Sequence, residues 1–278
     1  MYRFINNIKT AFLLSGLWML FVFAGRAIAG QTGMYVALVL GGMTSVFAFF
    51  FSAKLALASM RAQPVDPRQA PELYEMVEEL AQKANIPTPK IYICPQQAPN
   101  AFATGRSPRN AAVCVTQGLM QMLNHNELKA VIAHELAHIK HRDILIASIA
   151  AVIAGGISAL GYMFYFMPLG GDDDDGNPLA AIALMILAPI AAVLIQMAIS
   201  RRREFNADNY GAELVGNPKY LADALTRLHN SASRIPMHLA MESQKALFIV
   251  KPFTGKKAKD LFSSHPSLED RIAALMNN

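Results

Sequence analysis

Charged residues are scarce in this sequence of 278 residues, since Asp, Glu, Lys and Arg together make up only 16% of it. Hydrophobic residues make up 53%, and they gather in long runs without any charge. These runs cover residues 10–25, 27–53, 144–171 and 176–200. Each is long enough to cross a hydrocarbon core of about 30 Å. The composition excludes an ordinary water-soluble domain of this size and predicts an integral membrane protein.

Cysteine is scarce as well. The two cysteines, Cys94 and Cys114, lack the Cys-x-x-Cys spacing of a thiolate zinc site. We interpret them as a reduced, buried pair in a cytoplasmic part of the chain.

The net charge of +5 comes from basic residues that lie at the ends of the apolar runs. Because no basic face is interleaved with aromatic residues, we expect no nucleic-acid partner.

The four apolar runs predict about four transmembrane helices, arranged as two hairpins over 1–60 and 144–200. Lysine and arginine flank the ends of these runs, and by the positive-inside rule they place 61–143 and 201–278 in the cytoplasm. An alternative for the first run is a secretory signal that is cleaved after residues 27–29, Ala-Ile-Ala. Glycines and prolines in the second hairpin leave open whether it spans the bilayer completely.

The motif His134-Glu135-x-x-His138 carries the chemistry of the sequence. Its spacing puts two imidazoles one helical turn apart on the same side, so both can reach one small cation. Zinc is the expected ion, because it binds neutral imidazole and keeps one position for water in catalytic sites. Glu135 lies about 100° round the helix from His134, where a base can act on that water. The motif also recurs by chance, but in this apolar helix the polar residues would be buried without partners unless a metal is bound.

A two-histidine site needs a further ligand. His141 lies on the same helix face, but three side chains stacked over about 10 Å of helix cannot converge on one tetrahedral ion. We therefore predict Glu204 as the third ligand. Asp208 lies one turn later, and we expect it to accept the free N–H of a ligand histidine. The alternative is that Arg203, Glu204 and Asp208 form only an ion network beside the membrane.

The cytoplasmic part before the motif contains local signals of helix and sheet. The segment 71–84 has the period of an amphipathic helix, with apolar residues on one face and glutamates on the other. Three short β-rich pieces separated by turn residues predict one small sheet; they are 90–94, 100–105 and 111–116. Because no Gly or Pro occurs between His141 and Ile153, we expect the motif helix to run directly into the third apolar run.

These motifs, followed by Ser264-His265-Pro266 and Arg271, resemble the HtpX family of membrane zinc endopeptidases, which is related at the site to the CAAX prenyl-protein endopeptidases. The resemblance covers nearly the whole chain. It implies a mainly α integral membrane protein with a zincin-type α+β catalytic domain. The sheet and the motif helix of that domain come from 61–143, and the glutamate helix and the His-Pro motif come from 201–278. It also implies a multi-pass protein of the bacterial inner membrane whose catalytic domain faces the cytoplasm and degrades misfolded or damaged membrane proteins.

The resemblance assigns further residues. It makes Asn100, Ala101, Phe102 and Ala103 an edge strand that binds an extended substrate by main-chain hydrogen bonds, the alternative being a plain sheet strand. It makes His265 and Arg271 catalytic residues that approach the metal or the oxyanion. His265 is alternatively a latency ligand that fills the open position. Phe205 stands where many relatives carry Tyr, which removes one hydroxyl donor.

The expected function is zinc-dependent peptide hydrolysis with one Zn²⁺ per chain, in which Glu135 moves the proton. The expected partners are unfolded or damaged membrane proteins and the lipid bilayer, and the sequence favours no particular oligomeric state. Two alternatives remain. A non-cleaving protein that binds unfolded segments would have a closed four-ligand zinc shell. A prenyl-CAAX-type protease would need a larger intramembrane chamber than about four helices can build.

Overall fold

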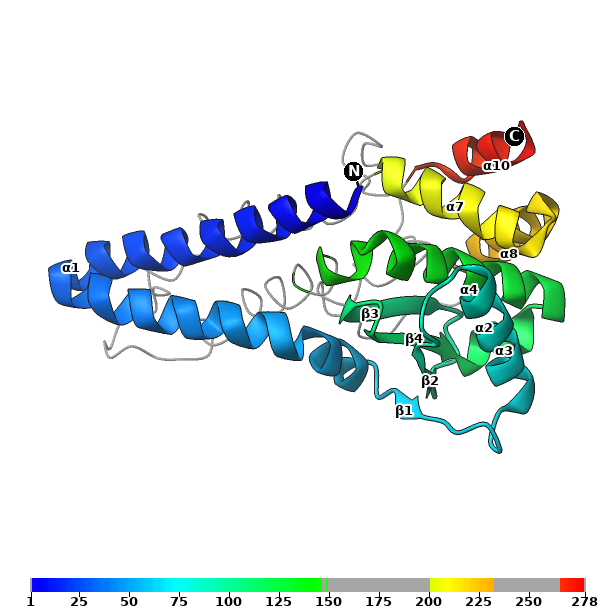
Figure 1. The fold of residues 1–278 in the computed structure, drawn as a ribbon, viewed down its shortest axis with the longest axis horizontal. Helices are drawn as coiled ribbons and strands as arrows, with labels where there is room; N and C mark the ends of the chain where they lie inside the picture. Colours follow the sequence, from blue (N-terminus) through cyan, green and yellow to red (C-terminus); the bar gives the residue numbers. More distant parts are fainter. Residues whose placement is uncertain (1, 147–148, 150–200, 233–265, 278) are drawn as a thin grey trace, which may run out of the picture.

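The computed structural model describes residues 2–146, 149, 201–232 and 266–277 (Figure 1). The helices in this part are α1 (Tyr2–Ser59), α2 (Pro71–Lys83), α3 (Gln117–Met122), α4 (His125–His141), α7 (Arg201–Val215), α8 (Pro218–Ala232) and α10 (Leu268–Met276). The strands are β1 (Gln63–Pro64), β2 (Lys90–Cys94), β3 (Ala101–Ser107) and β4 (Asn110–Thr116). The predicted mainly helical architecture with one small sheet is confirmed.

The N-terminal helix α1 doubles back near Gly30, and its two arms extend away from the rest of the molecule (Figure 1). Gly30 has a φ of 59°, a backbone conformation that glycine adopts without steric cost. Within the described part of the chain, no helix has both the length and the apolar character that a membrane crossing requires. The predicted second hairpin, 144–200, lies outside the described residues apart from 144–146 and 149.

The four strands form one sheet in the order β1-β2-β4-β3. The strands β2 and β4 are parallel, and the other two pairs are antiparallel. The three predicted β segments are therefore real strands of one sheet, to which the two-residue β1 adds an edge. The opposite edge is β3, which pairs with β4 alone among the described strands.

The two faces of the sheet are covered by different elements. On one face, the side chains of Ala101 and Ala103 join the main core with α2, α3, α4 and α8. On the other face, Phe102 packs with the end of α1 in a smaller cluster, as the alternation of side chains along a strand requires. Cys94 and Cys114 are buried, unbridged thiols of this smaller cluster, which agrees with the prediction of a reduced pair.

The motif helix α4 begins with a capping box, in which Asn124 and Glu127 each accept a hydrogen bond from the other's backbone N–H at 3.0 Å. Our prediction that this helix continues unbroken beyond His141 is wrong. Arg142 has φ 62° and ψ 30°, a left-handed conformation that ends the helix. Helical structure resumes at Asp143, after this single interruption.

The helices α4 and α7 pack closely side by side (Figure 1). Gly211 of α7 makes this possible, since a Cβ atom there would lie 2.9 Å from the backbone nitrogen of His134 and 3.0 Å from its Cα. The helices α8 and α10 pack against α7 in turn. Elements from 61–143 and from 201–278 thus form one core around the motif.

Candidate metal centre

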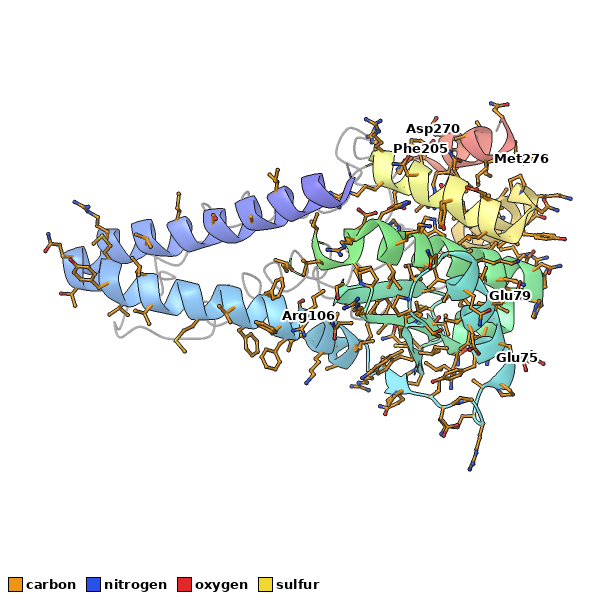
Figure 2. All side chains as sticks on the ribbon, in the orientation of Figure 1. Glu75, Glu79, Arg106, Phe205, Asp270 and Met276 are labelled. Atoms are coloured by element: carbon orange, nitrogen blue, oxygen red, sulfur yellow. The ribbon has the colours of Figure 1, made fainter. Side chains whose placement is uncertain are left out.

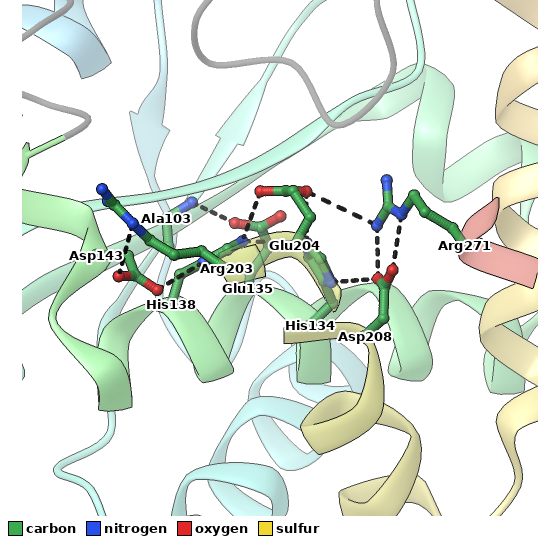
Figure 3. A network of polar contacts seen from close by, with 9 residues as sticks. All are labelled: Ala103, His134, Glu135, His138, Asp143, Arg203, Glu204, Asp208 and Arg271. Carbon is green, nitrogen blue, oxygen red and sulfur yellow. Dashed lines mark hydrogen bonds and ion pairs between the residues drawn. The ribbon is translucent and has the colours of Figure 1, made fainter. Parts of the chain in front are cut away.

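Three side chains from α4 and α7 converge on one point (Figure 3). The Nε2 atoms of His134 and His138 are 3.1 Å apart. Carboxylate oxygens of Glu204 lie 3.8 Å from the first of these nitrogens and 3.6 Å from the second. One ligand atom from each of the three residues falls within a group no more than 4.8 Å across. Helical spacing on α4 and the close approach of α7 together produce this convergence.

Glu135 lies beside this group and points toward the sheet. Its Oε2 atom accepts a hydrogen bond of 2.8 Å from the backbone N–H of Ala103 in β3. Burial raises the pKa of the Glu135 carboxyl above its ordinary value, although the two neighbouring histidines act against this rise. The bond from β3 therefore fixes the direction of a carboxylate that is a stronger base than one in water.

The far side of His134 is held by a carboxylate. Its Nδ1 atom lies 2.9 Å from Oδ1 of Asp208. Asp208 accepts two hydrogen bonds from the guanidinium of Arg271 on α10, at 2.7 and 2.6 Å. Burial works against ionisation of Asp208, but Arg271 outweighs it and keeps the pKa of this carboxyl below its usual range. One nitrogen of Arg271 also lies 3.9 Å from Glu204.

The far side of His138 is held in a similar way. Its Nδ1 atom lies 3.3 Å from Oδ2 of Asp143, whose other oxygen lies 3.7 Å from Nε of Arg203. Burial disfavours a charged His138, but the hydrogen bond that its Nδ1–H donates to Asp143 and the charges of Glu204 and Glu135 raise the pKa of its imidazole to about 9. Each histidine thus turns its Nε2 atom inward while a carboxylate holds Nδ1.

The donor set and the charge of the site fit a divalent cation. Two imidazoles and one carboxylate are ligands that zinc and similar ions accept. The network in Figure 3 contains four carboxylates, which belong to Glu135, Asp143, Glu204 and Asp208, and two guanidinium groups. With the imidazoles neutral and the carboxyls ionised, as metal ligation requires, these groups sum to a net charge of about −2, and buried charge of one sign is costly unless it is balanced. A divalent cation supplies that balance.

The structure brings together the residues that the spacing predicted as ligands, base and supporting carboxylate; they are His134, Glu135, His138, Glu204 and Asp208. His141 lies outside this group, with its ring centroid 5.5 Å from that of Tyr210. Arg271 joins the network by two hydrogen bonds to Asp208 and by the longer contact to Glu204. His265 lies outside the described residues.

The predicted substrate strand is adjacent to the site. Ala101, Phe102 and Ala103 belong to β3, and Ala103 contacts Glu135 directly. Asn100 precedes the strand and is tied to β4, because its backbone N–H donates to Thr116 Oγ1 at 2.9 Å. Phe205 on α7 is partly buried and is labelled in Figure 2.

Sequence reasoning overlooked Asp143 and misinterpreted Arg203. Asp143 is five residues after His138, and in a continuous helix a residue at that spacing faces away from the His138 side chain. From the sequence, Arg203 is expected in the basic cluster that marks the inner membrane surface or in an ion network with Glu204 and Asp208. Its contact of 3.7 Å with Asp143 is closer to the second of these expectations.

Comparisons with known proteins agree with this geometry. Residues 67–278 match the model of the family described as "Peptidase family M48". The chain is 47% identical over 277 residues to proteins named "Protease HtpX homolog" from Burkholderia mallei strain SAVP1 and Burkholderia pseudomallei strain K96243. Each alignment covers 98% of this chain and 96% of the relative. The crystal structure of S. mikatae Ste24p is similar in fold, with a TM-score of 0.52 at 17% identity, and the alignment covers 98% of this chain and 66% of that one.

Proposed function

This chain belongs to peptidase family M48 and is a metalloprotease; we propose that its metal is zinc and that it cleaves misfolded or damaged membrane proteins at the cytoplasmic side of a membrane. The observation that carries the catalytic part is the convergence of two imidazoles and one carboxylate within 4.8 Å of one another, with Glu135 beside them. The mainly helical zincin-like domain with its small sheet places all of these groups on neighbouring elements.

Zinc fits the site best, because His134, His138 and Glu204 are the neutral and anionic donors that it takes in catalytic sites with one open position. Among the described residues the ligand group has three members. When bound, zinc lowers the pKa of a coordinated water and polarises the scissile carbonyl.

Glu135 does the proton transfer in this proposal. Its Oε2 atom is engaged by Ala103, so the other oxygen is the one that takes a proton from the attacking water and later delivers it to the leaving amine. The raised pKa of this buried carboxyl suits both steps, since the group must accept a proton and then give it up.

Asp208 and Arg271 act on the Nδ1 side of His134, away from the metal position. The Asp208 carboxylate accepts from His134 and thereby fixes which nitrogen of the imidazole faces the metal. The resemblance implies that Arg271 approaches the metal or the oxyanion. Because its two short hydrogen bonds go to Asp208, we propose that it acts mainly through Asp208 and His134. For His265 we keep the proposal that it approaches the metal as a donor or a latency ligand.

We propose that the substrate binds along β3 as an added strand. The edge position of β3 and the bond between Ala103 and Glu135 put the proteolytic groups within reach of a chain paired with that edge. Main-chain pairing recognises extended backbone more than particular side chains. This mode of binding suits unfolded segments, which is the substrate class that the resemblance implies.

The proposed membrane location rests on the surface of α1. Large hydrophobic side chains are exposed along its second arm, among them Tyr35, Val36, Val39, Met43, Val46, Phe47, Phe50 and Phe51. Cations lie at the end of this arm nearest the sheet, where the Arg106 guanidinium is 4.8 Å from the Phe50 ring and Lys54 Nζ is 5.6 Å from the Phe51 ring (Figure 2). An apolar surface bordered by basic groups is typical of a segment that enters a bilayer from the cytoplasm.

Replacing Glu135 by Gln tests the catalytic proposal. Gln keeps the shape of the side chain and its bond from Ala103 but cannot accept the proton, so we expect metal content equal to that of the parent and cleavage slower by about 10² to 10⁴. Purified protein loaded with zinc is incubated with a loosely folded membrane protein and with the same protein stably folded, and a chelator-treated sample is the control. Equal cleavage by the Gln variant contradicts the role of Glu135. Equal cleavage of both substrates contradicts the substrate class.

Alkaline extraction tests the membrane location. We expect the full chain to stay in the membrane pellet at high pH, because apolar contact with lipid does not depend on charge. A tag at the C-terminus should be protected when protease is added outside intact spheroplasts and digested when they are lysed. Release into the supernatant contradicts insertion, and digestion in intact spheroplasts contradicts the cytoplasmic orientation.

A further inference from the structure

Both histidines of the metal group have the same kind of support, although only one support was expected. Behind His134 are Asp208 and then Arg271, and behind His138 are Asp143 and then Arg203. In each case a carboxylate lies next to Nδ1 and an arginine lies next to the carboxylate (Figure 3). On α7 the two supports lie on either side of Glu204, since Arg203 precedes Glu204 directly while Asp208 follows it by one turn.

The backbone is specially shaped to bring Asp143 to His138. In an uninterrupted helix, residue 143 would stand about 140° round the axis from His138 and face away from it. Arg142 instead adopts the left-handed conformation, with φ 62°, which residues other than glycine, asparagine and aspartate rarely do. The chain therefore leaves the path of α4, and Oδ2 of Asp143 comes to 3.3 Å from Nδ1 of His138. Unusual backbone at such a place is a mark of a functional constraint.

Arg203 differs from the other arginines of its cluster. Arg201 and Arg202 are exposed at the start of α7, whereas the side chain of Arg203 is only 11% exposed and lies beside the equally shielded Asp143. A basic residue that serves only to mark the membrane surface would remain in solvent. Because Arg203 is adjacent to Glu204, the same turn of α7 carries a metal ligand and the support of another ligand.

We propose that Asp143 and Arg203 are positioning residues of the metal centre. Asp143 accepts the Nδ1 proton of His138, so that Nε2 is the nitrogen that faces the ion, and Arg203 holds Asp143 in place. The inference rests on the proposed metal site and adds residues that act on its affinity. It also means that the two ends of the segment 144–200 are joined by an ion pair in contact with a ligand, so a displacement of either end changes the geometry at His138.

Metal affinity and ligand geometry are the readouts for this proposal. The full chain is purified in detergent as the parent and as Asp143→Ala, Asp143→Asn, Arg203→Gln and Arg203→Lys. Zinc affinity is measured by competition with a coloured chelator, and ligand geometry from the visible absorption of the Co²⁺-loaded protein. We expect Asp143→Ala to bind zinc about 10- to 100-fold more weakly and to change the Co²⁺ spectrum. Asp143→Asn and Arg203→Gln should lose less affinity, and Arg203→Lys should recover part of the loss.

The matched control is Arg202→Gln, an exposed arginine one residue away on α7, for which we expect parental affinity and spectrum. Melting temperatures with chelator and with zinc separate positioning from general stability. If the residue positions a ligand, its replacement reduces the increase in melting temperature that zinc produces. If its role is purely structural, the replacement lowers the melting temperature measured with chelator and leaves the increase on adding zinc unchanged. If Asp143→Ala does not fold, the zinc affinities and Co²⁺ spectra of the two Arg203 variants test the positioning role instead.

Two failures remain distinguishable. Parental zinc affinity and an unchanged Co²⁺ spectrum in the Asp143 and Arg203 variants overturn the positioning role while the metal site stands. Absence of zinc binding by the parent protein itself overturns the proposed function.

Discussion

The residues that support the two ligand histidines differ in how far their side chains are exposed to solvent. Side-chain exposure is 0% for Asp208 and 3% for Arg271, compared with 10% for Asp143 and 11% for Arg203. Coulombic attraction grows as water is excluded, and two short parallel hydrogen bonds join Arg271 to Asp208. The Asp208–Arg271 pair is therefore the stiffer support, and it also ties α10 to α7.

Replacing Arg271 by Gln should destabilise the fold strongly. The change leaves a fully buried Asp208 carboxylate without its counter-ion, and breaking one partner of such a pair costs about 3–5 kcal/mol. We expect a correspondingly lower midpoint in denaturant for the chelator-treated protein, and weaker zinc binding because Asp208 no longer holds His134. Arg202→Gln, at an exposed position, is the control and should change stability by less than about 0.5 kcal/mol. A parental midpoint for Arg271→Gln would show that the pair contributes nothing to stability.

At the scale of elements, the site depends on how closely α7 approaches α4. Glu204 and Gly211 are seven residues apart, two helical turns, so they lie near the same face of α7. Gly211 lets the backbone of α7 rest against the backbone of His134, and this contact sets the distance at which Glu204 meets the imidazoles. A small residue two turns away thus determines a ligand distance.

Replacing Gly211 by Ala should weaken metal binding by moving α7. The new methyl carbon would lie 2.9 to 3.2 Å from backbone atoms of Ala133 and His134, which cannot rotate away. We expect lower zinc affinity in chelator competition and a changed Co²⁺ spectrum. The matched control is Gly216→Ala at the end of the same helix, where φ is 80° and no atom lies within 4 Å of the added carbon. That variant should lose about 1–2 kcal/mol of stability from backbone strain but keep the zinc affinity of the parent. Equal affinity in both variants contradicts the proposed link.

The elements that local patterns predicted are those whose cause is local. The amphipathic period of α2, the alternation and turns around β2, β3 and β4, and the His-Glu-x-x-His spacing each identify a structure from neighbouring residues alone. Glu204 and Asp208 could be paired with the motif because helical spacing and zinc chemistry restrict the choices. Asp143 could not be assigned to the site in this way, because its position depends on the left-handed conformation of Arg142. The sequence has no Gly or Asn there to indicate such a conformation. The contact of Arg271 with Asp208 joins residues 63 positions apart, and no local pattern encodes it.

At the scale of the whole molecule, the metal centre is built from two stretches of chain on either side of 144–200. The sheet and α4 come from the first stretch, and α7, α8 and α10 come from the second. Their packing and the Asp143–Arg203 contact bring the end of one stretch to the start of the other. The division into two membrane hairpins and a catalytic domain in two parts stays a prediction, because 144–200 lies almost entirely outside the described residues. We propose that the catalytic domain folds around its own core.

Replacing residues 150–200 by about a dozen Gly and Ser residues tests this independence. On the two sides of this segment, the side chains of Asp143 and Arg203 lie 3.7 Å apart, and a flexible linker of that length reaches about 20 Å. Closing a shorter loop costs little entropy, because each halving of the length changes the closure free energy by only about 0.6 kcal/mol. We expect the shortened protein to bind zinc with the affinity of the parent and to show the same Co²⁺ spectrum, since the described ligands and both supports are retained. The control is the same replacement in the Asp143→Ala background, which should again bind weakly. A shortened protein that melts cooperatively but no longer binds zinc would show that 150–200 contributes directly to the metal centre. The catalytic domain would then include this segment.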